Sequence, residues 1–389
     1  MKKIIFYTDS LIMGGAEKIA LDYVKMLVEI GKYEIQLLIN EDNGDKGNIL
    51  IDKIPKNVNY QFIVDKNIME KLNYSREKKQ RNIFYKLQYN YYLLKRRKKR
   101  EKRIKEILLR EKYDCIIDFY NILPNDIIDE RVISWQHTTL QNYSEKSLKL
   151  FKKRLSKIKY LIVLNEEMKE EVLKIFSNYK DKIKVIYNFF DIEEIERLSL
   201  DKSKLNKQEE ELIEKDYFFA CCRLDKYKGI DILIEAYKIL KEKYGIKEKL
   251  YIAGIGDQKE ILENLVKNYN LEKDIVFLGL QKNPYVWMKN AKFFVHSSYR
   301  EGLPTVVIEG LIANGIVISS NCPTGPKEIL ENGKVGVLFS VGNKEELAKK
   351  ILNILENREL LENYKKEARR RIRDFSKEKI SKKILEILK

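Results

Sequence analysis

The chain has 389 residues with a formal net charge of +17, and 44% of its residues are hydrophobic. The length suits two domains of about 190 residues each, and the hydrophobic content is sufficient for two cores, which excludes a disordered chain. No run approaches the roughly eighteen apolar residues of a spanning helix, so no membrane-spanning segment is expected. Four cysteines lack both metal-ligand spacing and a disulfide framework, which predicts a reducing compartment; they are Cys115, Cys221, Cys222 and Cys322.

Strand-like apolar runs alternate with amphipathic segments along the whole chain, a pattern that predicts parallel sheets covered by helices. The expected strands lie at residues 3–7, 34–39, 59–63, 114–118, 131–135, 160–164 and 183–187, and then at 217–222, 249–253, 274–278, 292–296, 315–319 and 336–339. The expected domains are an N-terminal one at 1–190, a polar linker at 191–215, a second domain at 216–372 and a C-terminal helix at 373–389.

Two glycines follow the first expected strand. Gly14 and Gly15 stand directly before an amphipathic segment with apolar residues at 19, 21, 24, 27 and 28. Glycines before a helix let backbone amides approach a ligand closely. This signal is weak when it is taken alone.

A second candidate site follows the apolar run at 218–222. Arg223 and Lys228 lie in the loop after this run, and an amphipathic segment begins at Ile230. Open α/β sheets bind ligands at the carboxyl ends of their strands, and an arginine with a lysine suits a diphosphate. In so basic a chain, an ordinary solvated loop is the alternative.

A third site lies in the segment 297–310. The expected strand at 292–296 enters a turn with Glu301 and Gly302, and a helix then begins at about Pro304 and Thr305. Proline suits the first helical turn, and the unpaired N–H groups of residues 305–307 would form an anion site. Glu309 lies one turn further along the face of Thr305. A carboxylate this close to a phosphate would repel it, so we expect the glutamates to accept hydrogen bonds from sugar hydroxyls. The plainer interpretation is a strand, turn and helix with two solvated glutamates.

Basic residues are concentrated at 95–103, where eight of nine positions are lysine or arginine, directly after the aromatic-rich segment 84–94. We interpret residues of about 77–112 as a basic amphipathic helix lying on an anionic membrane surface. The residues expected to contact the lipid are Arg96, Arg97, Lys98 and Lys99. A solvated helix and a nucleic-acid-binding face are the alternatives.

Other nucleotide motifs are incomplete. Gly254 and Gly256 begin a dinucleotide fingerprint, but Lys259 stands where the third glycine would be, which disfavours a dehydrogenase. No Walker loop is present. No Asp-x-Asp triplet occurs to hold a divalent ion on a diphosphate, so the sequence predicts no metal site.

Taken together, the three sites resemble the retaining glycosyltransferase family four, whose GT-B fold has two Rossmann-like parallel-sheet domains facing a cleft. The resemblance rests on the glycine pair, on Arg-Leu-x-x-x-Lys-Gly from Arg223 to Gly229, and on Glu-x7-Glu at Glu301 and Glu309. It covers nearly the whole chain. The run at 321–330 resembles the members that build bacterial capsule, lipopolysaccharide and lipid-linked glycans.

The resemblance implies roles for individual residues. Arg223 and Lys228 would stabilise the departing diphosphate, while Glu301 would bind hydroxyls of the sugar and Glu309 those of the ribose. The residues expected to bind the donor are Gly14, Gly15, Gly254, Gly279, Leu280, Gly302, Leu303, Pro304, Thr305, Val306 and Glu309. In the family, the C-terminal helix packs back on the first domain.

The chain has two histidines. His137 follows the expected strand at 131–135, where a lone histidine is usually structural, but the resemblance places it beside the reacting sugar and makes it a catalytic candidate. His296 lies inside the strand that leads to Glu301, and we interpret it as structural.

The resemblance implies an enzyme that transfers a hexose or N-acetylhexosamine with retention, without a metal or cofactor. The expected donor is a UDP-sugar and the expected acceptor a lipid-linked or cell-surface glycan. The protein would lie at the inner face of the cell membrane, peripheral and cytoplasmic, with no nucleic-acid partner. The alternatives are a basic nucleic-acid-binding protein on an α/β scaffold and a GT-B phosphorylase.

Overall fold

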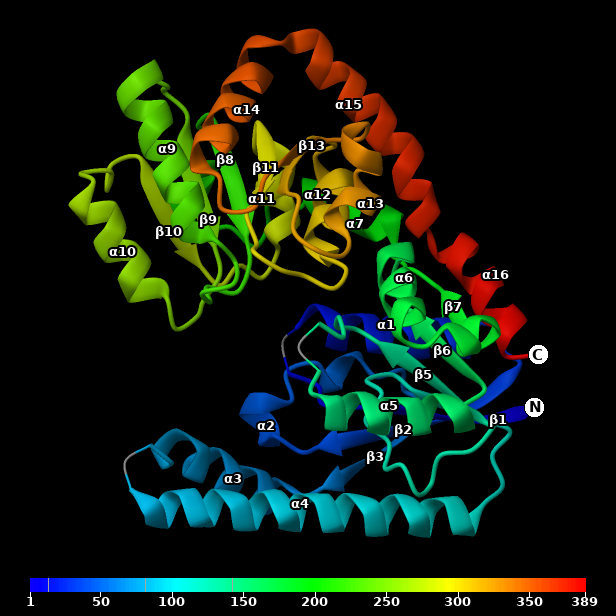
Figure 1. Cartoon of the computed structure of the whole chain (residues 1–389). Coiled ribbons are helices and arrows are strands. Elements are labelled where there is room, and N and C mark those ends of the chain that lie inside the picture. Colours follow the sequence, from blue (N-terminus) through cyan, green and yellow to red (C-terminus); the bar gives the residue numbers. More distant parts are fainter. Residues whose placement is uncertain (13, 81, 142) are drawn as a thin grey trace. The chain divides into compact units, whose positions relative to one another are not determined.

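The computed structural model of the chain describes residues 1–12, 14–80, 82–141 and 143–389 (Figure 1). Met13 of the N-terminal glycine loop and Arg81 of the expected basic helix therefore lie outside the described residues. The chain divides into two compact units. The first contains residues 1–164, 169–186 and 381–389, and the second contains residues 165–168 and 187–380.

The first unit is built on a seven-stranded parallel sheet of order β3-β2-β1-β4-β5-β6-β7. Its strands are β1 Lys2–Thr8, β2 Tyr33–Glu41, β3 Asn59–Val64, β4 Cys115–Asp118, β5 Val132–Gln136, β6 Tyr160–Val163 and β7 Ile183–Val185. The order reverses between β1 and β4, so the carboxyl ends of these two strands flank a topological switch point, where such sheets bind ligands.

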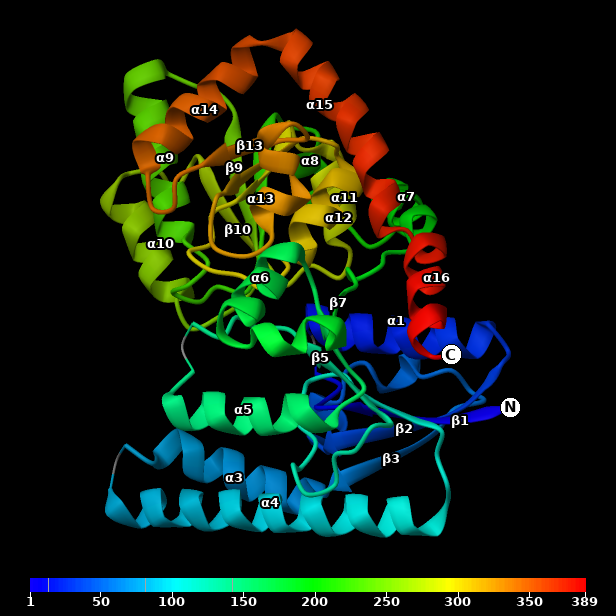
Figure 2. The ribbon, with the colours of Figure 1, turned by 45° about the vertical axis from the view of Figure 1, so that its right-hand side comes forward.

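Helices surround this sheet and connect its strands. They are α1 Gly15–Glu29, α2 Gly44–Gly47, η1 Ile51–Lys53, α3 Lys66–Lys78, α4 Ile83–Arg110, α5 Glu145–Lys157, α6 Glu166–Ile175 and η2 Ser177–Lys182. The long helix α4 runs beside α3 in two views (Figure 1, Figure 2). Asn82 caps α4 by accepting a hydrogen bond from the N–H of Tyr85.

The second unit contains a six-stranded parallel sheet of order β10-β9-β8-β11-β12-β13. Its strands are β8 Tyr217–Cys221, β9 Lys249–Ala253, β10 Ile275–Gly279, β11 Phe293–His296, β12 Val317–Ser320 and β13 Val337–Phe339. Here the switch point lies between β8 and β11. All thirteen strands expected from the alternation of the sequence are confirmed, with ends that differ by up to two residues.

The helices of the second unit are α7 Ile192–Leu200, α8 Lys207–Ile213, α9 Ile230–Tyr244, α10 Lys259–Asn268, α11 Pro284–Asn290, α12 Thr305–Ala313, α13 Pro326–Ile329, η3 Glu331–Gly333, α14 Lys344–Glu356, α15 Arg358–Arg371 and η4 Ile372–Phe375. The last helix, α16 Lys377–Ile387, has its first residues in the second unit and the rest in the first. Apolar residues of α9, α10 and α14 form one core with the sheet. On α12, Gly310 lies against the ring of Phe294, which brings the helix close to β11.

The segment 191–215, expected as a polar linker, is instead folded into the second unit as α7 and α8. Asp191 and Asn206 cap these helices, and Asn206 does so in a reciprocal capping box with Glu209. The side chain of Asn283 donates to the carbonyl of Leu198 at 2.7 Å, which ties α7 to the start of α11. The many charges of this segment concealed the helical spacing of its apolar residues.

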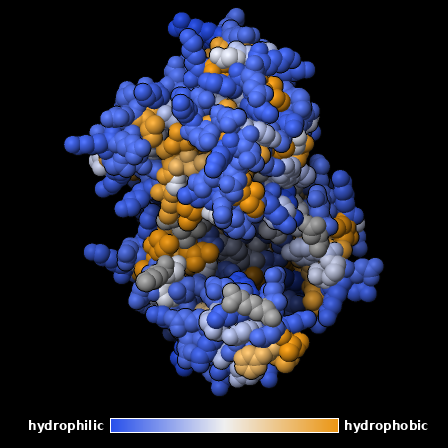
Figure 3. Space-filling model, turned by 90° about the vertical axis from the view of Figure 1, so that its left-hand side faces the viewer, coloured by the Kyte–Doolittle hydropathy of each residue, from blue (hydrophilic) through white to orange (hydrophobic). Residues whose placement is uncertain are grey.

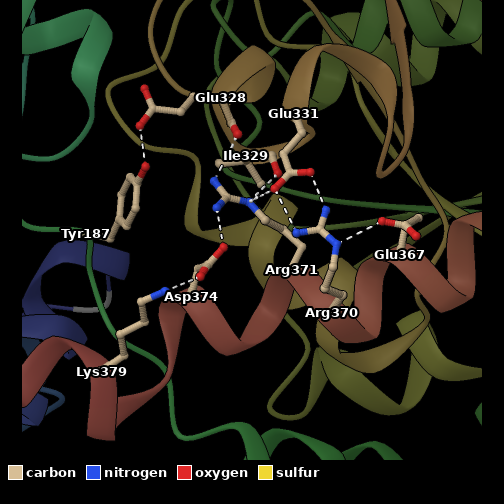
Figure 4. Close-up of polar contacts among 9 residues, drawn as sticks. All are labelled: Tyr187, Glu328, Ile329, Glu331, Glu367, Arg370, Arg371, Asp374 and Lys379. Carbon is tan, nitrogen blue, oxygen red and sulfur yellow. Dashed lines mark hydrogen bonds and ion pairs between the residues drawn. The ribbon is translucent and has the colours of Figure 1, made fainter.

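An ionic cluster fixes the short helix α13 to the end of α15 (Figure 4). The buried guanidinium of Arg371 donates to the carbonyls of Ile329 at 3.1 Å and Glu328 at 3.0 Å, and to the carboxylate of Asp374 at 2.6 Å. The hydroxyl of Tyr187 donates to Oε1 of Glu328 at 2.5 Å. This cluster anchors the segment that follows the loop at 321–325.

Candidate active site

Loops of the second unit meet at the carboxyl ends of β8 and β11, at the switch point of its sheet. Gly229, which ends the loop after β8, has a φ of 60°, and a Cβ there would lie 2.2 Å from the carbonyl oxygen of Ser297. The hydroxyl of Ser297 donates to the carbonyl of Lys228 at 3.0 Å. The two predicted motifs are therefore in backbone contact, because only glycine fits at this position, although Lys228 and Ser297 are 69 residues apart in the sequence.

The loop after β9 packs on the same edge. Gly254 has a φ of 139°, and a Cβ there would lie 1.8 Å from the carbonyl oxygen of Cys222. Its N–H donates to the carbonyl of Gly279 at 2.7 Å. Gly254 and Gly279 thus join the loops after β9 and β10 to the loop after β8, and Leu280 beside them leaves 51% of its surface exposed.

Lys228 and Glu301 form the centre of this edge. Nζ of Lys228 donates to Oε1 of Glu301 at 2.6 Å, and the hydroxyl of Ser298 donates to the same oxygen at 2.6 Å. The side chains are 22% and 14% exposed, respectively. Burial raises the pKa of Glu301, but His296 and Lys228 outweigh this effect and lower the pKa to about 2. Glu301 is therefore an ionised acceptor at neutral pH.

Arg223 differs from Lys228 in its surroundings. Its side chain is 76% exposed, and its Nε donates to Oδ2 of Asp225 at 2.8 Å. The guanidinium is thus oriented by a neighbour in its own loop while remaining accessible. A planar, accessible guanidinium suits bidentate binding of phosphate oxygens.

The anion site at the start of α12 is smaller than the sequence suggested. The helix begins at Thr305 with Pro304 as its N-cap rather than as its first residue. The N–H of Val307 donates to the carbonyl of Pro304 at 3.1 Å, so the expectation that it is available for a ligand is wrong. The N–H groups of Thr305 and Val306 precede the first helical hydrogen bonds and remain as candidate donors to an anion.

The turn before α12 is fixed by two other segments, the loop at 321–325 and the residue Asn165. The hydroxyl of Thr324 donates to the carbonyl of Glu301 at 2.5 Å, and the side-chain amide of Asn165 donates to the carbonyl of Gly302 at 3.0 Å. Gly325 has a φ of 108°, and a Cβ there would lie 2.6 Å from Cδ of Pro304. Leu303 is buried within this turn.

Glu309 lies on α12, one turn beyond Thr305 as predicted. The hydroxyl of Tyr285 on α11 donates to its Oε1 at 3.2 Å. A phenol that donates to one carboxylate oxygen fixes the plane of the group. Glu301 and Glu309 therefore lie on successive segments of one strand-turn-helix, each oriented by residues outside α12.

The remaining predicted site residues, His137, Gly14 and Gly15, belong to the first unit. His137 directly follows β5, and its Nε2 lies 2.6 Å from the carbonyl oxygen of Phe119. A carbonyl only accepts, so Nε2 carries the proton and Nδ1 is left as an acceptor. Burial lowers the pKa of His137 to about 4 even though Phe119 acts in the other direction. The imidazole is therefore neutral at pH 7.

Gly14 caps α1, and Gly15 is its first residue. A Cβ at Gly14 would lie 2.1 Å from Oε2 of Glu17, so a carboxylate of the first helical turn occupies space beside this glycine. Burial and the nearby Glu17 raise the pKa of the Tyr120 phenol, whose ring lies 5.1 Å from that of His137. The glycine loop and His137 are thus linked through one aromatic residue.

The four basic residues expected at a membrane surface differ in their orientation on α4. Arg96 pairs with Glu41 and is 25% exposed, and Lys99 lies 3.7 Å from Asp65. Arg97 is 69% exposed and donates to Glu101 at 2.8 Å. Lys98 is exposed. Arg96 therefore contacts its own domain, whereas the sequence had predicted that it contacts lipid.

Helix α4 also carries exposed apolar side chains at helical spacing. Phe84, Leu87, Tyr91 and Leu94 are between 58% and 65% exposed, and positions three or four apart share one face of a helix. Figure 3 shows apolar atoms at the lower end of the molecule, where α3 and α4 lie in Figure 1. Across the ranges described, no helix is both long and apolar enough to cross a membrane, and no three His, Cys, Asp or Glu side chains are grouped to hold a metal ion.

Comparison with protein families identifies residues 201–371 with the model described as glycosyl transferases group 1. The segment 201–371 of the second unit therefore matches a glycosyltransferase family. An uncharacterized glycosyltransferase of Methanocaldococcus jannaschii is 39% identical over 171 residues, which cover 44% of this chain and 41% of the relative. A relative from Campylobacter jejuni is 33% identical over 220 residues, which cover 56% of this chain and 57% of the relative. Its name is N-acetylgalactosamine-N,N'-diacetylbacillosaminyl-diphospho-undecaprenol 4-alpha-N-acetylgalactosaminyltransferase.

The chain spans about half the length of these relatives. Among solved structures, Anabaena HepE in complex with UDP and glucose matches with a TM-score of 0.71 and 20% identity, covering 100% of this chain and 99% of HepE. This match confirms the GT-B fold of the chain. The matched range 201–371 contains Arg223, Lys228, Glu301 and Glu309, and leaves out His137 and the glycine pair.

The sequence did not point to three residues that fix the candidate site or the loops around it. His296, interpreted as structural, contacts Glu301. Asn165 holds the Gly302 turn, although no sequence signal near it pointed there. In the first unit, the buried Asp118 accepts from the N–H groups of Ile122 and Leu123 at 3.0 and 2.9 Å. An aspartate at the end of an apolar run was the available signal for this last residue.

Proposed function

We propose that the protein is a retaining glycosyltransferase that transfers a hexose or N-acetylhexosamine from a UDP-sugar to a lipid-linked or cell-surface glycan. The observation that carries the proposal is the arrangement of Lys228, Glu301 and the start of α12 at one edge of the second sheet. It brings together a cation, an ionised acceptor and the first N–H groups of a helix, which are the groups that a sugar diphosphate requires. The names of the Campylobacter relative and of the UDP complex of HepE support the choice of donor and acceptor.

Each group has a role in this proposal. Arg223 and Lys228 stabilise the negative charge that develops on the diphosphate as the glycosidic bond breaks. The N–H groups of Thr305 and Val306 add to this stabilisation. Glu301 accepts from hydroxyls of the sugar, and Glu309 accepts from hydroxyls of the ribose. An ammonium group has three N–H donors, so Lys228 can bind a phosphate oxygen while it donates to Glu301.

His137 contacts the donor sugar as a neutral imidazole, through the Nδ1 atom that Phe119 leaves unprotonated. With a pKa lowered to about 4 it is a weak base, so it does not take the proton of the attacking hydroxyl. The proton of the attacking hydroxyl therefore goes to an oxygen of the departing diphosphate, on the face from which the acceptor attacks. This route produces retention without a protein nucleophile and without a metal ion.

A donor screen tests the proposal. The protein is incubated with UDP-glucose, UDP-N-acetylglucosamine, UDP-N-acetylgalactosamine and GDP-mannose, each with a polyprenyl-diphosphate-linked sugar, and release of nucleotide is followed. We expect UDP release that depends on the acceptor, and an α-linked product in the NMR spectrum. No nucleotide release from any donor, or an inverted product, would contradict the proposal.

Attachment of α4 to an anionic membrane completes the proposed function and places the enzyme at the inner face of the cell membrane. Helical spacing puts Lys95, Lys98 and Lys102 on the same face as the exposed apolar residues, and all three are exposed. Each cation near an anionic surface contributes about 1 kcal/mol, and the apolar side chains add interfacial contact. The lipid-facing cations in this proposal are thus Lys95, Lys98 and Lys102, and of the four residues predicted from the sequence only Lys98 is kept, in place of Arg96, Arg97 and Lys99.

Two triple variants separate this face from the total charge. Replacing Lys95, Lys98 and Lys102 with glutamine should release the protein from phosphatidylglycerol vesicles in a sedimentation assay. Replacing Arg97, Lys99 and Arg103 removes the same charge from other sides of α4 and should leave most of the binding. Equal release by both variants, or displacement of lipid by RNA at lower concentration than by anionic vesicles, would contradict the membrane assignment.

A further inference from the structure

His296 joins the sheet of the second unit to the candidate site. It is the last residue of β11 and is 4% exposed. Its Nδ1 lies 2.8 Å from the hydroxyl oxygen of Ser319, its register partner on β12. Its Nε2 lies 3.1 Å from Oε1 of Glu301. The ring therefore spans from the centre of the sheet to the carboxylate.

The direction of these hydrogen bonds follows from the groups involved. The ionised carboxylate of Glu301 can only accept, so Nε2 of His296 carries a proton and donates it. The hydroxyl of Ser319 can take either role toward Nδ1 and also lies 3.1 Å from the carbonyl oxygen of Ser320. Ser319 thus fixes the ring from one side while Glu301 uses the other.

Among the described residues, three side chains donate to the same oxygen of Glu301. Lys228, Ser298 and His296 each donate to Oε1. Lys228 and Ser298 lie in loops, whereas His296 is held in a buried strand and by Ser319. A rigid donor fixes the direction of a carboxylate more firmly than donors on loops. With Oε1 occupied in this way, Oε2 is the oxygen left to accept from a ligand.

We propose that His296 is a positioning residue that orients Glu301 so that Oε2 accepts from a hydroxyl of the donor sugar. This inference rests on the proposed function, because it assigns Glu301 to the sugar rather than to the nucleotide. A histidine that merely filled the core would contribute volume, and any side chain of similar size would replace it. A positioning histidine requires a donor at the place of Nε2.

Two amide variants distinguish these roles. In His296→Gln the side-chain amide reaches the place of Nε2 and can donate to Glu301, whereas in His296→Asn it reaches only the place of Nδ1. We expect His296→Asn to lower kcat/KM for transfer by roughly 10- to 100-fold, the size of one hydrogen bond to a charged group. His296→Gln should retain transfer within about threefold of wild type. Calorimetry should give the same affinity for UDP alone in both variants.

Tyr217→Phe is the matched control, because it also removes a buried hydrogen bond, from the Tyr217 hydroxyl to the carbonyl of Trp287, at a place that does not contact Glu301. It should change stability without changing transfer. Equal losses of transfer in His296→Gln and His296→Asn, or no loss in His296→Asn, would overturn the inference.

A spectroscopic measurement tests the contact without a donor. The chain has two histidines, so a nitrogen-15 spectrum of the imidazoles is simple, and His137→Gln assigns it. We expect a protonated Nε2 in His296 and a change of its resonance in Glu301→Gln. An unprotonated Nε2 at neutral pH would overturn the inference. If wild type gave this signature but transferred no sugar, the proposed function would fail while the contact stood.

Discussion

Nζ of Lys228 and Oε1 of Glu301 lie 2.6 Å apart, although 73 residues separate them in the sequence. The pair joins the loop after β8 to the turn before α12, so it connects the two motifs of the second unit directly. One residue was expected to bind a diphosphate and the other a sugar. Their contact means that a change at either one alters the other.

Lys228→Ala should lower turnover by roughly 10²- to 10³-fold, the cost of one donor aimed at developing charge. It should also lower the free energy of unfolding of the second unit by about 1–3 kcal/mol, because Glu301 keeps its buried charge without its cation. Arg223→Ala should lower turnover comparably and leave stability nearly unchanged, since an exposed ion pair contributes little. Steady-state kinetics and urea unfolding followed at Trp287 measure both effects. Equal stability losses would contradict the difference in their surroundings.

Glu309→Gln should weaken the binding of UDP, because the proposed contact of Glu309 is with the ribose. Glu301→Gln should reduce transfer and leave the affinity for UDP nearly unchanged, since its contact is with the sugar. Calorimetric titrations with UDP and with the UDP-sugar measure the two contributions separately. Tyr285→Phe is a further control that should reproduce part of the Glu309 effect, because Tyr285 orients this carboxylate. Equal loss of UDP affinity in both variants would contradict the assignment of Glu309 to the ribose and of Glu301 to the sugar.

Transfer should continue in excess EDTA. The proposed charge neutralisation comes from Arg223, Lys228 and the backbone at Thr305 and Val306, all of which belong to the chain. Initial rates before and after dialysis against EDTA test this expectation. Activity that returned only on addition of magnesium or manganese would show that these groups are insufficient.

The strands and the positions of the motifs could be predicted from the sequence, because both depend on local patterns. The alternation of apolar runs predicted all thirteen strands. The motifs predicted that Arg223 and Glu301 lie in loops and Glu309 on a helix, as they do in the structure. The direction in which α4 presents its side chains was not accessible in this way. Arg96 and Lys98 look equivalent in a basic run, but helical rotation turns Arg96 toward Glu41.

Contacts between segments that are distant in the sequence could not be predicted either. His296 reads as one polar residue in an apolar strand, and its role depends on Ser319 and Glu301, which lie on other segments. The helices α7 and α8 were missed for a different reason. Their stability comes from capping residues and from packing on α11, whereas their composition is that of a charged linker.

The pKa of His137 predicts a dependence of stability on pH. The folded state holds the imidazole neutral down to about pH 4, whereas an unfolded chain binds the proton near its ordinary value of 6.5. The unfolded state therefore gains protons first, and the first unit should lose stability as the pH falls from 6.5 toward 4. Urea unfolding followed at Trp135, in a Trp287→Phe background, measures this change.

His137→Gln is the control for this dependence. Its side-chain amide can still donate to the carbonyl of Phe119 but does not titrate. Between pH 6.5 and 4, the free energy of unfolding of the variant should depend on pH less steeply, by about one bound proton. If the free energy of unfolding depended on pH equally in both proteins, the pKa of His137 would not be lowered in the folded protein.

Asp118 and Arg154 form a buried ion pair in the first unit, with side chains 0% and 8% exposed. Asp118 also accepts from the N–H groups of Ile122 and Leu123, so it fixes the loop that carries Phe119, the partner of His137. Asp118→Leu should lower the free energy of unfolding by about 3–5 kcal/mol, because it leaves a buried guanidinium without its counter-charge. Arg154→Met should cost a similar amount. The double variant should cost less than the two single losses added together, since neither charge is then left alone. Unfolding followed at Trp135 gives all four corners of this cycle, and strictly additive losses would show that the pair contributes no coupling to the frame that holds His137.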